Sequence, residues 1–166
     1  MADLDVNRVG SGIAQVPDYP VAGNLGFTKA IVNGTEYWRL FNDTGAALVD
    51  RTPYHVDFKV ANSDTNGPRV IALADDAVRH TLVVAMSAVV DQEWGWFAFM
   101  GKVDKMVVAS AARTTGHALK VLDGAVTTIG AAPAFLDTEF GVILEATETS
   151  AAIDVLLYGR EYLSTT

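Results

Sequence analysis

The stretch Tyr54-His55-Val56-Asp57-Phe58-Lys59-Val60 alternates strictly between two kinds of side chain. Aromatic and aliphatic residues occupy every second position, and His55, Asp57 and Lys59 lie between them. Successive side chains of a β-strand point to opposite faces of the sheet, so this pattern predicts a strand with one buried face and one polar face. The stretch therefore indicates that the chain is built from half-buried β-strands.

Short apolar runs recur on both sides of this stretch, separated by turn residues, with a loop expected at 62–68. Strands are expected at residues 36–41, 54–60, 70–73, 81–90, 94–100, 103–110, 118–122, 140–145 and 153–158. Residues 75–79 fit a single helical turn, although the apolar spacing over 70–78 also fits a helix. Roughly eight to ten strands at this spacing predict a mainly β fold, a β-sandwich, jelly-roll-like or barrel-like single domain over residues 27–166.

Residues 1–26 differ from the rest of the chain because they combine glycine and proline with isolated apolar residues. Such a segment has no run that would form a core strand or helix. It is either a frayed terminus or an extended N-terminal arm that becomes ordered on a partner. In the second case Val16, Tyr19 and Val21 are the expected anchors of the arm.

Charge and composition narrow the range of partners. The 166 residues carry a formal net charge of −8, with only 12 Lys and Arg, and these are scattered along the chain. Nucleic acids and anionic membranes attract basic surfaces, so we expect neither as a partner. Apolar residues make up 50% and charged residues 19%, below the usual ~25%. The excess apolar surface favours an oligomer.

Three further absences in the sequence guide expectations. There is no cysteine, which rules out disulfides, thiolate metal sites and a cysteine nucleophile. No apolar run approaches the ~18 residues of a membrane span. The opening Met1-Ala2-Asp3-Leu4-Asp5 is acidic where a secretory signal has a basic region, so no such signal is expected.

No pattern of residues nominates an active site. His55, His80 and His117 are isolated from one another, and no nucleophile elbow, phosphate-binding loop, dinucleotide fingerprint or EF-hand loop occurs. A site built from Asp75, Asp76 and His80 is conceivable, but a solvated turn explains those residues equally well. We therefore expect no enzyme, no cofactor and no metal.

Two of the expected strands, 81–90 and 94–100, are apolar on both faces. A strand of this kind needs cover on its second face from another sheet, a helix or a neighbouring subunit. Trp94, Trp96 and Phe97 are therefore candidate contacts to a partner or subunit.

The order of the motifs over residues 70–159 resembles that of a family of small head decoration (cement) proteins of tailed bacteriophages. The resemblance rests on Trp94-Gly95-Trp96-Phe97-Ala98-Phe99-Met100-Gly101, a valine-rich strand at 103–109, Gly116-His117-Ala118-Leu119-Lys120-Val121, Gly130-Ala131-Ala132, Phe140-Gly141-Val142-Ile143-Leu144-Glu145-Ala146 and a last strand at 153–159. His117 stands where the family pattern has an acidic residue, and the segment before residue 54 matches loosely.

This resemblance implies a homotrimer that is made in the host cytoplasm and binds the capsid exterior of the virion. There it would clamp adjacent major capsid proteins and would need no active site. The alternatives are another trimeric virion component, such as a head fibre, spike or tail part, and a small β-barrel ligand-binding or enzyme domain. Fibres usually show repeats, and none is present.

Overall fold

The regular structure consists of strands throughout the residues that the computed structural model describes, which are 27–58, 68–73, 81–108, 114–122, 125–129, 139–145 and 152–159. The proposed arm with Val16, Tyr19 and Val21, the turn expected at 75–79 and the Asp75–Asp76–His80 group lie outside these ranges. The strands are β1 (Thr28–Val32), β2 (Thr35–Asn42), β3 (Pro53–Asp57), β4 (Arg69–Ile71), β5 (Thr81–Ala85), β6 (Trp94–Val107), β7 (Ala118–Leu122), β8 (Ala125–Ile129), β9 (Gly141–Ile143) and β10 (Ala152–Tyr158).

The first two strands form a hairpin that the sequence analysis did not predict. The turn residues are Asn33 and Gly34, with φ of 50° and 81°, and Val32 pairs with Thr35 across the turn. A two-residue turn with two positive φ angles matches the twist of the strands and strongly favours Asn-Gly. This dipeptide was therefore the available signal for β1.

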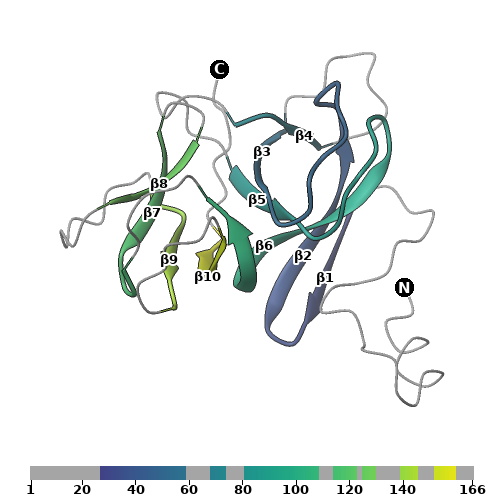
Figure 1. Cartoon of the computed structure of the whole chain (residues 1–166). Helices are drawn as coiled ribbons and strands as arrows, with labels where there is room; N and C mark the ends of the chain where they lie inside the picture. Colours follow the sequence, from purple (N-terminus) through teal and green to yellow (C-terminus); the bar gives the residue numbers. More distant parts are fainter. Residues whose placement is uncertain are drawn as a thin grey trace.

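Five strands close into a barrel, seen at the right of Figure 1. Around the barrel the order is β2, β4, β3, β5 and β6, and β6 returns to pair with β2. A ring with an odd number of strands cannot be antiparallel throughout, so one neighbouring pair must be parallel. That pair is β2 with β4, where Phe41 pairs with Arg69 and Asn42 with Val70. The mainly β prediction is confirmed, and among its forms the barrel is present.

The barrel interior holds one apolar cluster centred on Trp38. The Trp38 side chain is fully buried and stacks on Phe99 with 3.9 Å between ring centroids. The residues of this cluster are Trp38, Leu40, Leu48, Val56, Val70, Val83, Ala85, Val89, Phe97 and Phe99, with Tyr54 and Phe58 packed against them. Tyr54, Val56 and Phe58 thus share the buried face that their alternation predicted.

The polar face predicted for residues 54–60 is wrong at His55, which is only 3% exposed. In register, His55 lies between Ile71 of β4 and Leu82 of β5, on the outer wall of the barrel. Leu82 belongs to a second apolar cluster, so the outer wall is itself covered at this point. A period-2 pattern identifies the two faces of a strand, but it cannot reveal that a barrel wall has a second layer outside it.

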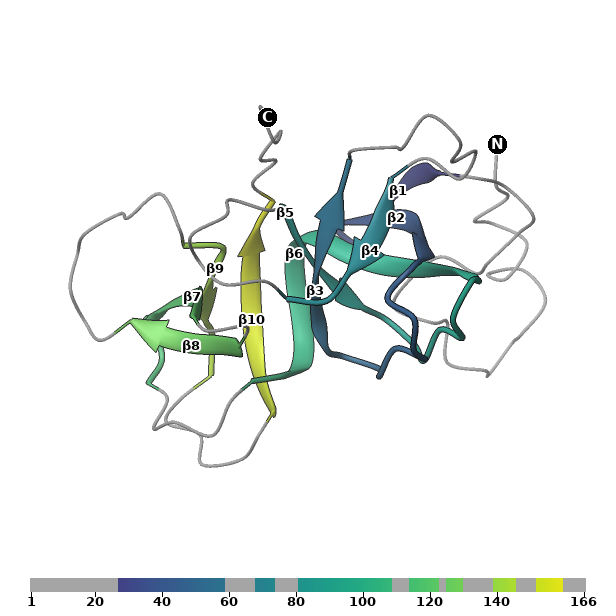
Figure 2. The same ribbon diagram turned by 90° about the horizontal axis from the view of Figure 1, so that it is seen from above.

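The second layer is a sheet that grows from the same strand that closes the barrel. Residues Trp94–Met100 of β6 pair with β2, and the rest of β6 pairs with β10 in the order β6, β10, β9, β7 and β8. Figure 2 shows β10 alongside β6, with β7, β8 and β9 beyond it. The sequence analysis split this strand into 94–100 and 103–110, because Gly101 was interpreted as a boundary. Gly101 instead lies within the strand, with φ of 107°.

Apolar residues from the barrel wall and from the second sheet meet in one cluster. The barrel contributes Tyr37, Leu82, Val84, Met86, Trp96 and Ala98, and the sheet contributes residues that include Val103, Met106, Leu119, Ile143, Ile153, Val155 and Leu157. The second faces of Trp96 and Ala98 are therefore covered from within the chain. The sequence analysis expected a sheet, a helix or a neighbouring subunit to bury the second face of the strands that are apolar on both faces. At Trp96 and Ala98 it is a second sheet of the same chain.

A bulge interrupts the pairing of β6 with β10. The register shifts between Ile153 and Val155, and Lys105 has φ of 57°. Burial raises the pKa of Asp154, but the hydrogen bond from the Lys105 backbone N–H (3.0 Å) and the Lys102 ammonium (3.3 Å) contribute to a net lowering. Because folding lowers this pKa, the contacts stabilise the bulge fully at pH values above the ordinary carboxyl pKa of 3.8. Their contribution to stability is lost as the pH falls through the lowered pKa of Asp154.

Candidate interaction surface

Two loops meet at one end of the barrel. Residues 43–52 connect β2 to β3, and residues 86–93 connect β5 to β6. Leu48 and Val89 form an antiparallel bridge between the loops, with N···O distances of 2.8 and 3.4 Å. Both side chains are buried in the barrel cluster, so the bridged loops close the end of the interior.

The outward side of this bridge is apolar as well. In an antiparallel pairing the residues that flank the bridge, Ala47 and Val49 on one loop and Ala88 and Val90 on the other, face away from Leu48 and Val89. Ala47 then lies opposite Val90, and Val49 lies opposite Ala88. All four are exposed, with Val49 at 61% and Val90 at 66%. We call these four residues the barrel-end surface.

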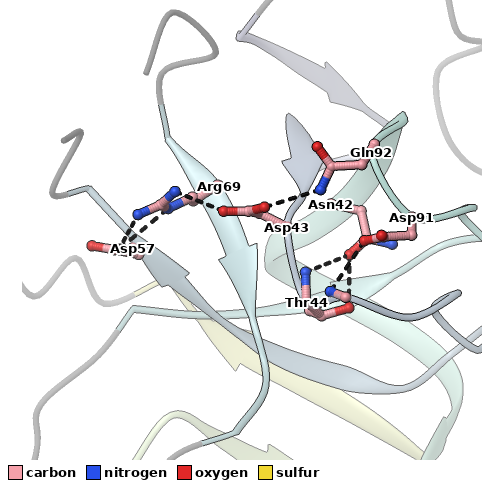
Figure 3. A network of polar contacts seen from close by, with 8 residues as sticks. Asn42, Asp43, Thr44, Asp57, Arg69, Asp91 and Gln92 are labelled. Carbon is pink, nitrogen blue, oxygen red and sulfur yellow. Dashed lines mark hydrogen bonds and ion pairs between the residues drawn. The ribbon is translucent and has the colours of Figure 1, made fainter. Parts of the chain in front are cut away.

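Asn42, at the end of β2, holds the two loops together and is fully buried. Its amide nitrogen donates to the carbonyl oxygens of Ala46 (2.9 Å) and Val89 (3.2 Å), one in each loop. Its Oδ1 accepts from the backbone N–H (3.1 Å) and the hydroxyl (2.9 Å) of Thr44. Figure 3 shows Asn42 beside Thr44 and Asp91. Since all four partner groups belong to the loops, this side chain ties both loops to the end of β2.

A line of charged and polar groups continues from Asn42 across the barrel end (Figure 3). Arg69 of β4 contacts Asp43 at 2.6 Å and Asp57 at 3.4 Å. The amide of Gln92 donates to the other oxygen of Asp43 at 3.0 Å. Asp91 accepts a hydrogen bond from the Gly45 backbone N–H at 3.1 Å. Each loop is thereby linked to the other and to the barrel wall.

The Val89 side chain packs closely against Gly95 of β6. A Cβ atom on Gly95 would lie 2.2 Å from one methyl group of Val89, so no larger residue fits while Val89 keeps this position. Gly95 belongs to β6 and pairs with Leu40 of β2. Val89 therefore rests directly on the backbone of β6.

We expect Asn42→Ala to lower the free energy of unfolding by about 1–3 kcal/mol, because it removes the hydrogen bonds that a fully buried amide makes to groups of both loops. Gln92→Ala is the matched control, since Gln92 is exposed and its bond to Asp43 should contribute less than about 1 kcal/mol. Urea denaturation measures both. Equal losses would mean that the loops do not depend on Asn42.

Trp94, Trp96 and Phe97, the contacts proposed from sequence that fall within the described residues, do not belong to the barrel-end surface. Phe97 is fully buried in the barrel interior, and Trp96 is 3% exposed in the cluster between the barrel and the second sheet. Trp94 is half-buried and packs edge-on against Phe41 at 5.5 Å, with the Arg39 guanidinium 5.2 Å from its ring. His117 is half-buried just before β7.

Sequence analysis missed the barrel-end surface. The available signal was Val90, the last residue of a run that is apolar on both faces. In the structure the run at 81–90 is not one strand: β5 ends at Ala85, and Val89 lies in the bridge between the two loops. Other parts of the chain bury the apolar residues of β5, whereas the Val90 side chain is exposed.

Over the residues described, no group of three or more His, Cys, Asp or Glu side chains is placed to hold a metal ion. Within the same ranges no helix has the length and apolarity that crossing a membrane requires. No family model, curated protein or solved structure matches this chain.

Proposed function

We propose that this protein is a capsid decoration (cement) protein, which binds the outside of an assembled phage head as a homotrimer and clamps neighbouring major capsid proteins together. The observation that carries the proposal is the barrel-end surface, where exposed valines lie on loops that hydrogen bonds within the chain already hold in place. The motif order over residues 70–159 supports the same assignment by resemblance.

A surface on ordered loops is suited to a protein that functions by binding to a larger assembly. Binding loses less conformational entropy when the contact loops are already ordered, so more of the contact energy remains as affinity. A ligand that binds the assembled shell in preference to its separate subunits stabilises the shell by mass action. Three linked copies would multiply weak individual contacts, provided that the geometry allows simultaneous attachment.

The direct test uses heads of the tailed phage whose genome carries this gene, prepared without the protein. We expect the purified chain to cosediment with assembled heads, not to bind unassembled major capsid protein, and to raise the temperature at which heads release DNA. Light scattering should give a mass near three times 17.7 kDa. Failure to bind assembled heads would overturn the proposal, and a monomer that binds would overturn only the trimer.

A further inference from the structure

We propose that the barrel-end surface docks on a protein patch of defined chemistry: a shallow apolar patch framed by lysine and arginine side chains on the assembled shell. This inference rests on the proposed function and deepens it, because it assigns both the contact surface of this chain and the character of its partner.

The first argument is the chemistry of the outward side chains. Loops run over the protein surface, where polar and charged residues are the ones most often exposed. Here all four outward positions are alanine or valine, and two of them are β-branched side chains exposed by more than three fifths. Val49 and Val90 have stiff χ1 angles, so they lose little rotamer freedom when they are buried by a partner.

The second argument distinguishes this surface from four other exposed apolar residues. Met100, Leu144 and Leu156 are each 39% exposed, and the charged residues Lys102, Asp104 and Asp154 stand beside them on β6 and β10. Ile31 is 67% exposed but belongs to the short strand β1. The barrel-end surface instead groups four outward apolar side chains from two loops that one buried amide connects.

The third argument is the charge around the surface. Asp43, Asp50, Asp91 and Glu93 all lie within the same two loops, and Asp50 and Asp91 directly follow Val49 and Val90. Arg69 is held between Asp43 and Asp57, and Arg51 lies 3.6 Å from Asp50. The border of the surface is therefore acidic, in a chain whose formal net charge is −8.

An apolar centre with a charged border is the usual anatomy of a protein interface, and complementary charge speeds the encounter of two proteins. An acidic border selects a basic partner. It disfavours nucleic acid and anionic membranes, and it also disfavours the same acidic surface on a second copy, which like charge would repel. A basic-framed apolar patch on the shell is therefore the occupant to which the geometry points.

The first experiment measures the affinity of purified variants for heads that lack the protein. Val49→Ser with Val90→Ser keeps the charge and shortens the apolar side chains, and we expect the dissociation constant to rise roughly tenfold or more. Ile31→Ser is the matched control, since Ile31 is equally exposed on β1, and we expect a change of less than about twofold. Circular dichroism and the thermal midpoint establish that each variant is folded.

The second experiment tests the charge. Asp50→Asn with Glu93→Gln should lower the association rate and flatten its dependence on salt, because steering by exposed charges is screened by ions. Asp104→Asn, which removes an exposed carboxylate on the second sheet, should leave both unchanged. Unaltered rates in the first variant, or wild-type binding that strengthens with salt, would overturn the basic-partner assignment.

The outcomes separate this inference from the proposed function. If the wild type binds heads and the double serine variant binds equally well, this surface is not the contact, although the protein remains a cement protein. If the double serine variant changes the solution mass, the surface lies between copies and the inference is wrong. If the wild type does not bind heads, the proposed function itself fails.

Discussion

Replacing Trp38 by alanine is expected to lower the free energy of unfolding by about 3–5 kcal/mol, the range for removing a large buried aromatic side chain. Trp38 is fully buried in the barrel, stacks on Phe99, and packs edge-on against Phe27 and Phe58. Its indole N–H also donates to Glu36 at 2.7 Å. For a chain of this size the melting temperature should fall by roughly 6–20 °C.

Trp38→Phe is the matched control. It keeps an aromatic ring in the barrel but gives up the hydrogen bond to Glu36 and part of the side-chain volume, so a loss of about 1–2 kcal/mol is expected. Calorimetry and urea denaturation measure both variants. Equal losses in the two would show that ring packing inside the barrel is not the source of the stability.

The second large effect is expected at Gly101, where Gly101→Ala should lower the free energy of unfolding by about 2–4 kcal/mol. Its φ of +107° disfavours any residue with a Cβ atom. A Cβ here would also lie 2.7 Å from the Cα atom of Thr35 and 3.0 Å from the carbonyl oxygen of Gly34. Because those contacts are with backbone, a change of side-chain rotamer cannot relieve them.

Gly45→Ala separates the two causes. Gly45 also has a positive φ, +77°, but a Cβ atom there would meet nothing within 4 Å. The free energy of unfolding that Gly45→Ala loses should therefore come from backbone conformation alone, and we expect about 1 kcal/mol. Urea denaturation measures both variants. If Gly101→Ala were no worse than Gly45→Ala, the close approach of β6 to the hairpin turn would carry no energetic weight.

Local patterns predicted individual strands well. Residues 118–122 match β7, and the alternation at 54–60 correctly identified the side chains that face the interior. The sequence analysis missed two strands: β1 lacks a clean alternation of apolar and polar residues, and β8 follows β7 closely. Asn33-Gly34, a dipeptide typical of two-residue hairpin turns, was the available signal for β1.

The closure of the barrel could not be predicted from local patterns. It depends on pairing between segments far apart in the chain, such as β2 with β6 and the parallel contact of β2 with β4. The barrel-end surface was missed for a related reason. Val90 belongs to a run that is apolar on both faces, and only the tertiary structure shows that β5 is covered while Val90 is not.

The uninterrupted strand β6 has a mechanical consequence. Because its first half is bonded laterally to β2 and β5 and its second half to β10, a tensile load applied along β6 passes between barrel and sheet through one covalent backbone. Such a load shears several lateral hydrogen bonds at once and does not open them one after another. Pulled along this axis the molecule should extend little before it yields, and a force applied across β6 should separate it far more easily.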